Sequence, residues 1–275
     1  MSAILINGVD QGSGVVSIGG VPQVVGLPGV LVDYADYDLL PSSGEYATLN
    51  RVAVWRDTST EGSIWVPAYL RDWGLVTSLN TSTYTPGAPP ANWAELLGGT
   101  GTVAVSGDYI RLDTGVTAGG YAYLQYTPPA GWTAGHDVVV VVRCLIVDPA
   151  GYHSHGVCVE FWDTRAGSTF FARFSPRDPS SSRGGIIKGD VESYVGATFA
   201  AQTTVKTYVL EFPGATANDL CVVSVVGDQM ISAGGQGSGY SAAVASQRFR
   251  LFVYSLAGDR SIIDWRSINI YSRAG

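Results

Sequence analysis

The sequence contains few charged residues, and only two of its 275 residues are lysine. Charged side chains make up 14% of the chain, against about 25% in a typical globular domain, while 46% of the residues are hydrophobic. So little Lys and Glu argues against long solvated helices. The hydrophobic content argues against a disordered chain. Because no apolar run approaches about 18 residues, a membrane-spanning helix is not expected either.

Cysteine is also scarce. Cys144, Cys158 and Cys221 each lie within an apolar run, which is typical of buried thiols. The first residues, MSAILINGVDQGSG, have neither the basic segment nor the apolar segment of a signal peptide. We therefore expect the protein to be made in a cytoplasm and not to be exported by a signal peptide.

Basic residues do not form a cluster, which excludes a nucleic-acid-binding surface that neutralises phosphates. Residues 1–95 contain nine acidic and three basic residues, a net charge of −6, whereas residues 96–275 contain fourteen and thirteen, a net charge of −1. The acidic excess has two interpretations, a solvated surface or a surface that steers a basic partner.

Glycine is abundant, with 35 residues, and it separates short β-like segments throughout the chain. Before residue 41 these segments are too short to bury a core, so they indicate either a docking arm or an ordinary edge hairpin. Residues 46–74 predict a hairpin in which Trp55 and Trp65 are available to pack across the strands, and a core or hairpin role is favoured over ligand binding for both.

Residues 80–92, NTSTYTPGAPPAN, are typical of a linker, and a short helical turn is expected at 92–97. From residue 98 onward, many strands follow. The apolar run 138–142 predicts a central strand buried on both faces, and alternation at 203–212 and 248–254 predicts half-buried antiparallel strands. We predict an all-β protein with an N-terminal β-hairpin region (1–80), a Pro-rich linker (81–97) and a jelly-roll β-sandwich (98–275).

Two parts of the sequence resemble known families. Residues 207–212, 220–230, 248–254 and 263–271 resemble the last strands of concanavalin A-like lectin/glucanase sandwiches. The segment 47–68 is similar to short β-modules of bacteriophage tail-fibre and other virion appendage proteins.

These resemblances imply a phage virion surface protein, either a head fibre or decoration protein or a tail appendage. By resemblance, its N-terminal region docks to other virion proteins and forms a homo-oligomer, expected to be a trimer. Its jelly roll faces outwards, where a host-surface glycan is a possible ligand. No membrane insertion is implied.

The sequence does not predict catalysis or a cofactor. Glu160 and Asp163 are three residues apart, which places them on opposite faces of a strand, and no third acid follows. Ser238 lacks the Gly two residues before it that a nucleophile elbow requires. We therefore expect no enzyme. The alternatives are a polysaccharide-degrading enzyme on the same sandwich and a purely structural spacer.

Carbohydrate binding is the more specific hypothesis, because sugar rings bind exposed aromatic side chains flanked by polar groups. One cluster in the sequence has this composition: Tyr152, His153, His155, Trp162, Asp163 and Arg165. Trp162 follows an apolar run, so a core position is its alternative role. His153 and His155 have the spacing of paired metal ligands, but the surrounding turn residues favour a loop tip, and no metal site is assigned.

Overall fold

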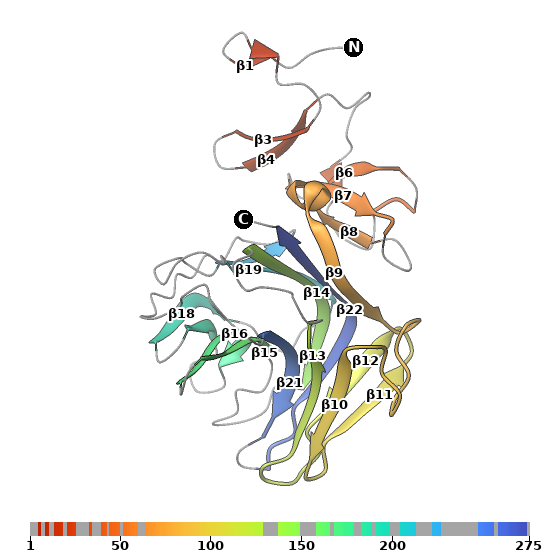
Figure 1. Ribbon diagram of the computed structural model, residues 1–275, viewed down its shortest axis with the longest axis vertical. Coiled ribbons are helices and arrows are strands. Elements are labelled where there is room, and N and C mark those ends of the chain that lie inside the picture. The colour runs from red at the N-terminus through yellow and green to blue at the C-terminus, as the bar shows by residue number, and fades with distance from the viewer. Residues whose placement is uncertain are drawn as a thin grey trace. The chain divides into compact units, whose positions relative to one another are not determined.

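Figure 1 shows the computed structural model, which has strands from β1 (Leu5–Ile6) to β22 (Ile262–Arg273). Side chains are described at residues 40–42, 44–47, 49, 53–59, 64–128, 138–147, 204–211, 249–255 and 258–273. The chain forms two compact units, one built mainly from Met1–Gly74 and the other mainly from the residues after it. Each unit is described by itself.

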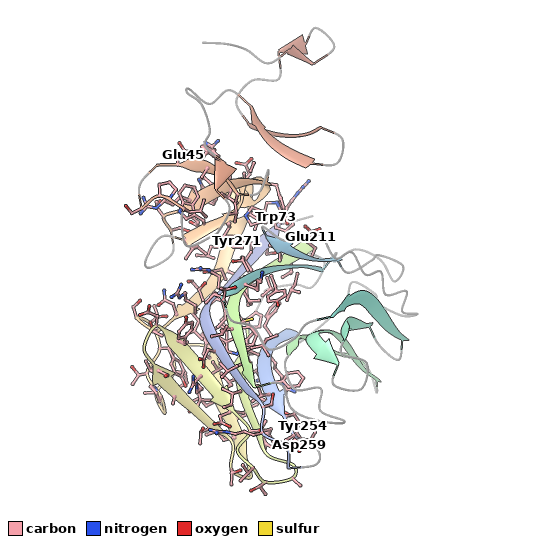
Figure 2. All side chains as sticks on the ribbon, turned by 180° about the vertical axis from the view of Figure 1, so that it is seen from behind. Glu45, Trp73, Glu211, Tyr254, Asp259 and Tyr271 are labelled. Atoms are coloured by element: carbon pink, nitrogen blue, oxygen red, sulfur yellow. The ribbon has the colours of Figure 1, made fainter. Side chains whose placement is uncertain are left out.

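In its described residues, the first unit contains short strands and one 3-10 helix. Its two hairpins and its four-stranded sheet are formed by β1 (Leu5–Ile6), β2 (Val9–Asp10), β3 (Gly14–Ile18), β4 (Val21–Val25), β5 (Asp33–Tyr34), β6 (Tyr46–Leu49), β7 (Val52–Asp57) and β8 (Ile64–Pro67), followed by η2 (Ala68–Asp72). β1 pairs with β2, and β3 with β4. The order in the four-stranded sheet is β5-β6-β7-β8. Figure 2 shows the described side chains of this sheet.

The expected hairpin is present, but its two tryptophans do not pack across from each other. Trp55 is opposite Val66, and Trp65 is opposite Arg56. Because neighbouring strand positions face opposite sides of a sheet, this one-residue offset separates the two rings. Trp65 is 6% exposed and packs in a small core with Ala47, Leu49 and Val54. The two rings therefore do not pack across the strands, whereas the expected core role is confirmed for Trp65.

The second unit consists of two seven-stranded sheets. Its strands are β9 (Gly74–Asn80), β10 (Trp93–Gly98), β11 (Thr102–Ser106), β12 (Tyr109–Asp113), β13 (Tyr121–Tyr126), β14 (Asp137–Asp148), β15 (Cys158–Arg165), β16 (Ser168–Asp178), β17 (Arg183–Lys188), β18 (Val191–Thr198), β19 (Lys206–Phe212), β20 (Val222–Val226), β21 (Gln247–Tyr254) and β22 (Ile262–Arg273). The β13 sheet has the order β10-β13-β21-β15-β16-β17-β18. The β14 sheet has the order β11-β12-β22-β14-β19-β20, with β9 paired to β22.

The chain passes repeatedly from one of these sheets to the other, for example from β12 to β13, from β13 to β14 and from β21 to β22. This arrangement produces a sandwich of two antiparallel sheets. β14 lies between β22 and β19, and residues 138–142 are each at most 2% exposed. The prediction of a central strand buried on both faces is confirmed, because a continuous apolar run suits a strand covered on both sides.

The segment expected as a linker is folded. Asn80 begins it with a turn, accepting hydrogen bonds from Ser82 and Thr83. Further along, Glu95 accepts hydrogen bonds from the Tyr84 hydroxyl and from the Gly87 N–H. These contacts fasten the Pro-rich stretch to β10.

The expected helical turn at 92–97 is wrong, since Trp93–Gly98 forms β10 and pairs along its whole length with β13. Sheet pairing overrides the helix propensity of its Ala, Glu and Leu residues. Residues 93–97, expected in the linker, therefore lie in the sandwich. The functional division into attachment region, linker and sandwich stays a prediction.

The structure tests the expected burial of the cysteines and of β19. Cys144 is a buried free thiol, as expected, and burial raises its pKa; the side chains of Cys158 and Cys221 lie outside the described residues. β19 is not half-buried, because consecutive residues Thr207, Tyr208 and Val209 are all at most 2% exposed. Among the residues that the structure describes, no helix is long and apolar enough to span a bilayer.

Candidate functional site

The described part of the β13 sheet has one apolar face and one face rich in aromatic and polar groups. Along β13, the residues Tyr121, Tyr123 and Gln125 are half-buried, whereas the residues between them are buried. Strand alternation explains this pattern, because successive side chains face opposite sides of the sheet. The half-buried set therefore lies on the side of the sheet that faces away from the core.

The neighbouring strand β21 extends this face. In the ladder, Arg250 is opposite Gln125, Phe252 opposite Tyr123, and Tyr254 opposite Tyr121. Directly opposed residues share a face of the sheet. We call this set the aromatic face; its residues are Tyr121, Tyr123, Gln125, Arg250, Phe252 and Tyr254. Figure 2 labels Tyr254 at the end of β21.

The rings of the aromatic face pack on one another. The ring centroids of Tyr121 and Tyr123 are 4.7 Å apart with an interplanar angle of 31°. Tyr123 and Phe252 are 5.2 Å apart in an edge-to-face arrangement at 67°. Phe252 is 4% exposed, while both tyrosines are half-buried. The contacts between rings hold the tyrosines in fixed orientations at the surface of the sheet.

Arg250 is held beside these rings by two interactions. Its Nε donates a hydrogen bond to Gln125 Oε1 over 2.8 Å. Its guanidinium carbon lies 5.9 Å from the centroid of the Tyr123 ring, within the range of a cation–π interaction. A fixed guanidinium and an amide next to aromatic rings form a surface with both apolar and hydrogen-bonding character.

The opposite face of the same strands supplies a rigid support. Leu124, Leu251 and Val253 are each at most 3% exposed. Tyr126 packs between Trp93 and Phe249, with ring centroids 5.3 Å and 6.2 Å away. Because this core is closely packed, the strands that carry the aromatic face cannot shift independently.

Half of the sequence-predicted site residues can be placed on the sheet. Trp162, Asp163 and Arg165 lie in β15, the strand next to β21, where Trp162 is opposite Arg248 and Asp163 is opposite Gln247. Their side chains are outside the described residues. Tyr152, His153 and His155 lie entirely outside them, so the predicted cluster is neither assembled nor contradicted.

The sequence reasoning missed every residue of the aromatic face. A signal was nevertheless present, because Tyr121-Ala-Tyr-Leu-Gln-Tyr126 alternates aromatic or amide residues with residues of the core. The predicted cluster lies on the neighbouring strand. In the ladder, Glu160 of β15 is opposite Arg250, which places the predicted strand directly beside the aromatic face.

The main charged cluster of the β14 sheet is an ion-pair network. Asp264 accepts two hydrogen bonds of 2.7 Å from Arg111, and Asp113 accepts bonds from Arg260 and from the Gly115 N–H. Burial alone would raise the pKa of Asp113, but these bonds and the nearby arginine charges hold it below its usual range. In the described part of the chain, no three His, Cys, Asp or Glu side chains are grouped to hold a metal ion.

Solved structures show which fold this sandwich has. No family model matches the sequence, and no curated protein sequence does. A peanut lectin with a nine-residue peptide aligns with a TM-score of 0.51 at 16% identity, over 72% of this chain and 97% of the lectin. The exoplasmic/lumenal domain of VIP36, in its Ca²⁺/Man3GlcNAc-bound form, aligns with a TM-score of 0.51 at 12% identity, over 74% of this chain and 91% of that chain. The fold is a lectin-type jelly-roll β-sandwich, which confirms the predicted fold class.

Proposed function

We propose that this protein binds carbohydrate and that the aromatic face holds the sugar. The observation that supports this proposal is the arrangement around Tyr123, whose ring lies between Tyr121 and Phe252 and beside the guanidinium of Arg250. A pyranose ring has an apolar side that stacks on an aromatic ring and a rim of hydroxyl groups that accept and donate hydrogen bonds. The Tyr123 ring can stack on the apolar side of the sugar, and Arg250 and Gln125 can form hydrogen bonds with its hydroxyl groups.

The fold is compatible with this function without establishing it, because one fold hosts many functions. The VIP36 domain was solved in a form bound to Ca²⁺ and Man3GlcNAc. None of the six residues of the aromatic face has a carboxylate, and Glu160, opposite Arg250 on the neighbouring strand, is a single acid, whereas glycoside hydrolysis uses a pair. We therefore propose binding without catalysis.

A glycan array followed by calorimetry tests the proposal. Tyr123→Ala and Arg250→Gln are each expected to weaken binding of the best glycan at least tenfold, or about 1.4 kcal/mol. Tyr109 and Arg266 provide a matched control, because Arg266 lies 5.2 Å over the Tyr109 ring, away from the aromatic face. Tyr109→Ala and Arg266→Gln should leave binding unchanged. Equal losses in both pairs, or no glycan bound, would exclude the aromatic face as the site.

A reducing-sugar assay on the same glycans separates binding from the enzymatic alternative. We expect no sugar release. The position of Glu160 opposite Arg250 makes Glu160→Gln the informative variant. Release of sugar that this substitution abolishes would establish a glycoside hydrolase instead.

We further propose that the protein is displayed on the surface of a phage virion, with the first unit docking to the particle and the sandwich facing outwards. The separate compact first unit and the resemblance of its 47–68 segment to virion appendage modules support this placement. Removing residues 1–73 leaves β9 available to the β14 sheet and should yield a chain that melts cooperatively but no longer associates with particles. Particle association of this truncated chain would contradict the proposed division.

A further inference from the structure

The hairpin β3–β4 is a two-stranded sheet with mostly apolar residues on both sides, and each side also has one polar residue, Ser17 or Gln23. Its strands, Gly14–Ile18 and Val21–Val25, are joined by two glycines. The ladder places Val15 opposite Val24 on one side, and Ile18 opposite Val21 on the other. A two-stranded hairpin is marginally stable in water. Pairing with further strands would therefore stabilise it.

The two outer edges of the hairpin differ in their capacity to pair. Next to a two-residue loop, the flanking pair, here Ile18 and Val21, exchanges hydrogen bonds, and the following pair directs its backbone groups outwards. That following pair is Ser17 and Pro22. Pro22 has no N–H, so the outer edge of β4 lacks a donor there. The outer edge of β3 keeps the N–H and C=O groups of both Val15 and Ser17.

The position of the hairpin within the first unit leaves the same edge open. β4 lies against β7 and η2 in the described part of this unit. In the described pairing, β3 has β4 as its sole neighbour in the sheet. The open edge of β3 is thus the one with complete hydrogen-bonding capacity.

This edge is complementary to a second copy of itself. If two β3 strands run antiparallel with Val16 opposite Val16 of the partner subunit, then Val15 is opposite Ser17 of the partner subunit, and Ser17 is opposite Val15 of the partner subunit. Because 15 and 17 are the residues whose backbone groups point outwards, both pairs exchange two hydrogen bonds. The product is a four-stranded sheet, β4-β3-β3-β4, whose outer edges each contain Pro22.

We propose that the protein forms a two-fold symmetric dimer through the open edge of β3. Pairing satisfies the exposed backbone groups and raises the sheet to four strands, which is within the range of independently stable sheets. The proline on each outer edge discourages addition of a third chain. The assembly is therefore closed at two copies, in contrast to the trimer that the family resemblance implies. This inference is independent of glycan binding.

The first test measures the mass of the full-length chain by light scattering or mass photometry. The wild type should have twice its 28.9 kDa chain mass. Ser17→Pro removes an outward donor, as Pro22 does on the other edge, and should yield monomers; Ser17→Ala keeps the N–H and should remain dimeric. The sandwich should melt at the same temperature in all three. A monomeric or trimeric wild type would overturn the proposal, as would a Ser17→Pro variant that stays dimeric.

The second test does not depend on whether the hairpin tolerates proline. At the two-fold axis, Val16 is opposite Val16 of the partner subunit in a pair without hydrogen bonds, where Cα atoms lie about 4.5 Å apart and a disulfide can form. Val16→Cys should give a covalent dimer under mild oxidation. Gln23→Cys, on the same side but on β4, should not, and the wild type sets the background of the native thiols. Equal cross-linking at both positions, or none at position 16, would overturn the proposed register.

Discussion

The ring of Tyr121 lies over Gly98, its ladder partner on the edge strand β10, so closely that a Cβ atom at position 98 would overlap the ring. The glycine at this point of the edge strand makes room for an aromatic residue of the neighbouring strand, a pairing that compensates for the weak strand preference of glycine. Tyr121 in turn contacts Tyr123, so this small residue supports the aromatic face.

We predict that Gly98→Ala destabilises the sandwich by about 1–3 kcal/mol, as expected for an overpacked contact, and displaces the Tyr121 ring. Urea unfolding measures the first effect. In a Tyr121→Ala background the same substitution should cost much less, because the overlapping ring is absent. Additive costs in this double-mutant cycle would show that the ring is not the cause.

Gly101→Ala should destabilise the sandwich more than Gly98→Ala. Its Cβ would overlap the backbone carbonyl of Tyr121, which cannot move aside.

The Arg111–Asp264 pair should contribute strongly to stability. Asp264 is 2% exposed and is held by two hydrogen bonds from one guanidinium. Asp264→Asn replaces one acceptor oxygen with an NH2 donor, so Arg111 loses one of its two hydrogen bonds and the charge of its bonded partner, and a loss of about 2–4 kcal/mol is expected in chemical denaturation. Asp108→Asn is the matched control, because its pair with Arg266 spans 3.5 Å and the Asp108 side chain is 80% exposed. That substitution should cost less than about 1 kcal/mol; similar losses would contradict the assignment.

Asp113 should make the sandwich sensitive to acid. Its pKa is held below the usual value of about 3.9, so its ionised form stabilises the folded state at neutral pH. This contribution is complete above the pKa of the unfolded chain and is lost as the pH falls through the lower pKa of the folded chain. The urea concentration at the midpoint of unfolding should therefore decrease as the pH is lowered below about 4. Asp113→Asn should make this decrease smaller. An identical acid profile in wild type and variant would exclude this role.

Tyr84 should make the sandwich lose stability at alkaline pH. Burial raises its pKa most, and the hydrogen bond to Glu95 adds to this increase, so the folded state retains the hydroxyl proton. The contribution of Tyr84 to stability is complete below the pKa of an unfolded tyrosine, about 10, and it declines as the pH rises above that value. Tyr84→Phe should lower stability at pH 7, because Glu95 loses a donor, but should flatten the decline between about pH 9.5 and 11. A parallel decline in both proteins would contradict the prediction.

The sequence predicted best those elements whose pattern is local. The valine run of β14 has no polar residue that could face water, so a fully buried strand is the simplest interpretation, and the structure confirms it. The offset between Trp55 and Trp65 could not be predicted in the same way, because one residue of register decides which face each ring occupies.

The aromatic face could not be predicted from the sequence, because its residues come from segments that are far apart in the chain. Gln125 and Arg250 are 125 residues apart in the sequence, and only the ladder between β13 and β21 brings them together. Trp93 shows a second limit, since the Ala, Glu and Leu residues after it favour a helix locally, while pairing with β13 makes the segment a strand. Both errors arise from contacts between distant segments.

The position of β22 has a consequence for how the protein is synthesised. β22 separates β12 from β14, and its Asp264 binds Arg111 from 153 residues earlier in the sequence. During translation, β12 and β14 emerge long before the strand that belongs between them. Until β22 is made, both present unpaired edges, which favours association with other nascent chains and delays folding. Formation of the sandwich therefore depends on strand β22, and prolonged ribosomal pausing before residue 262 should increase aggregation.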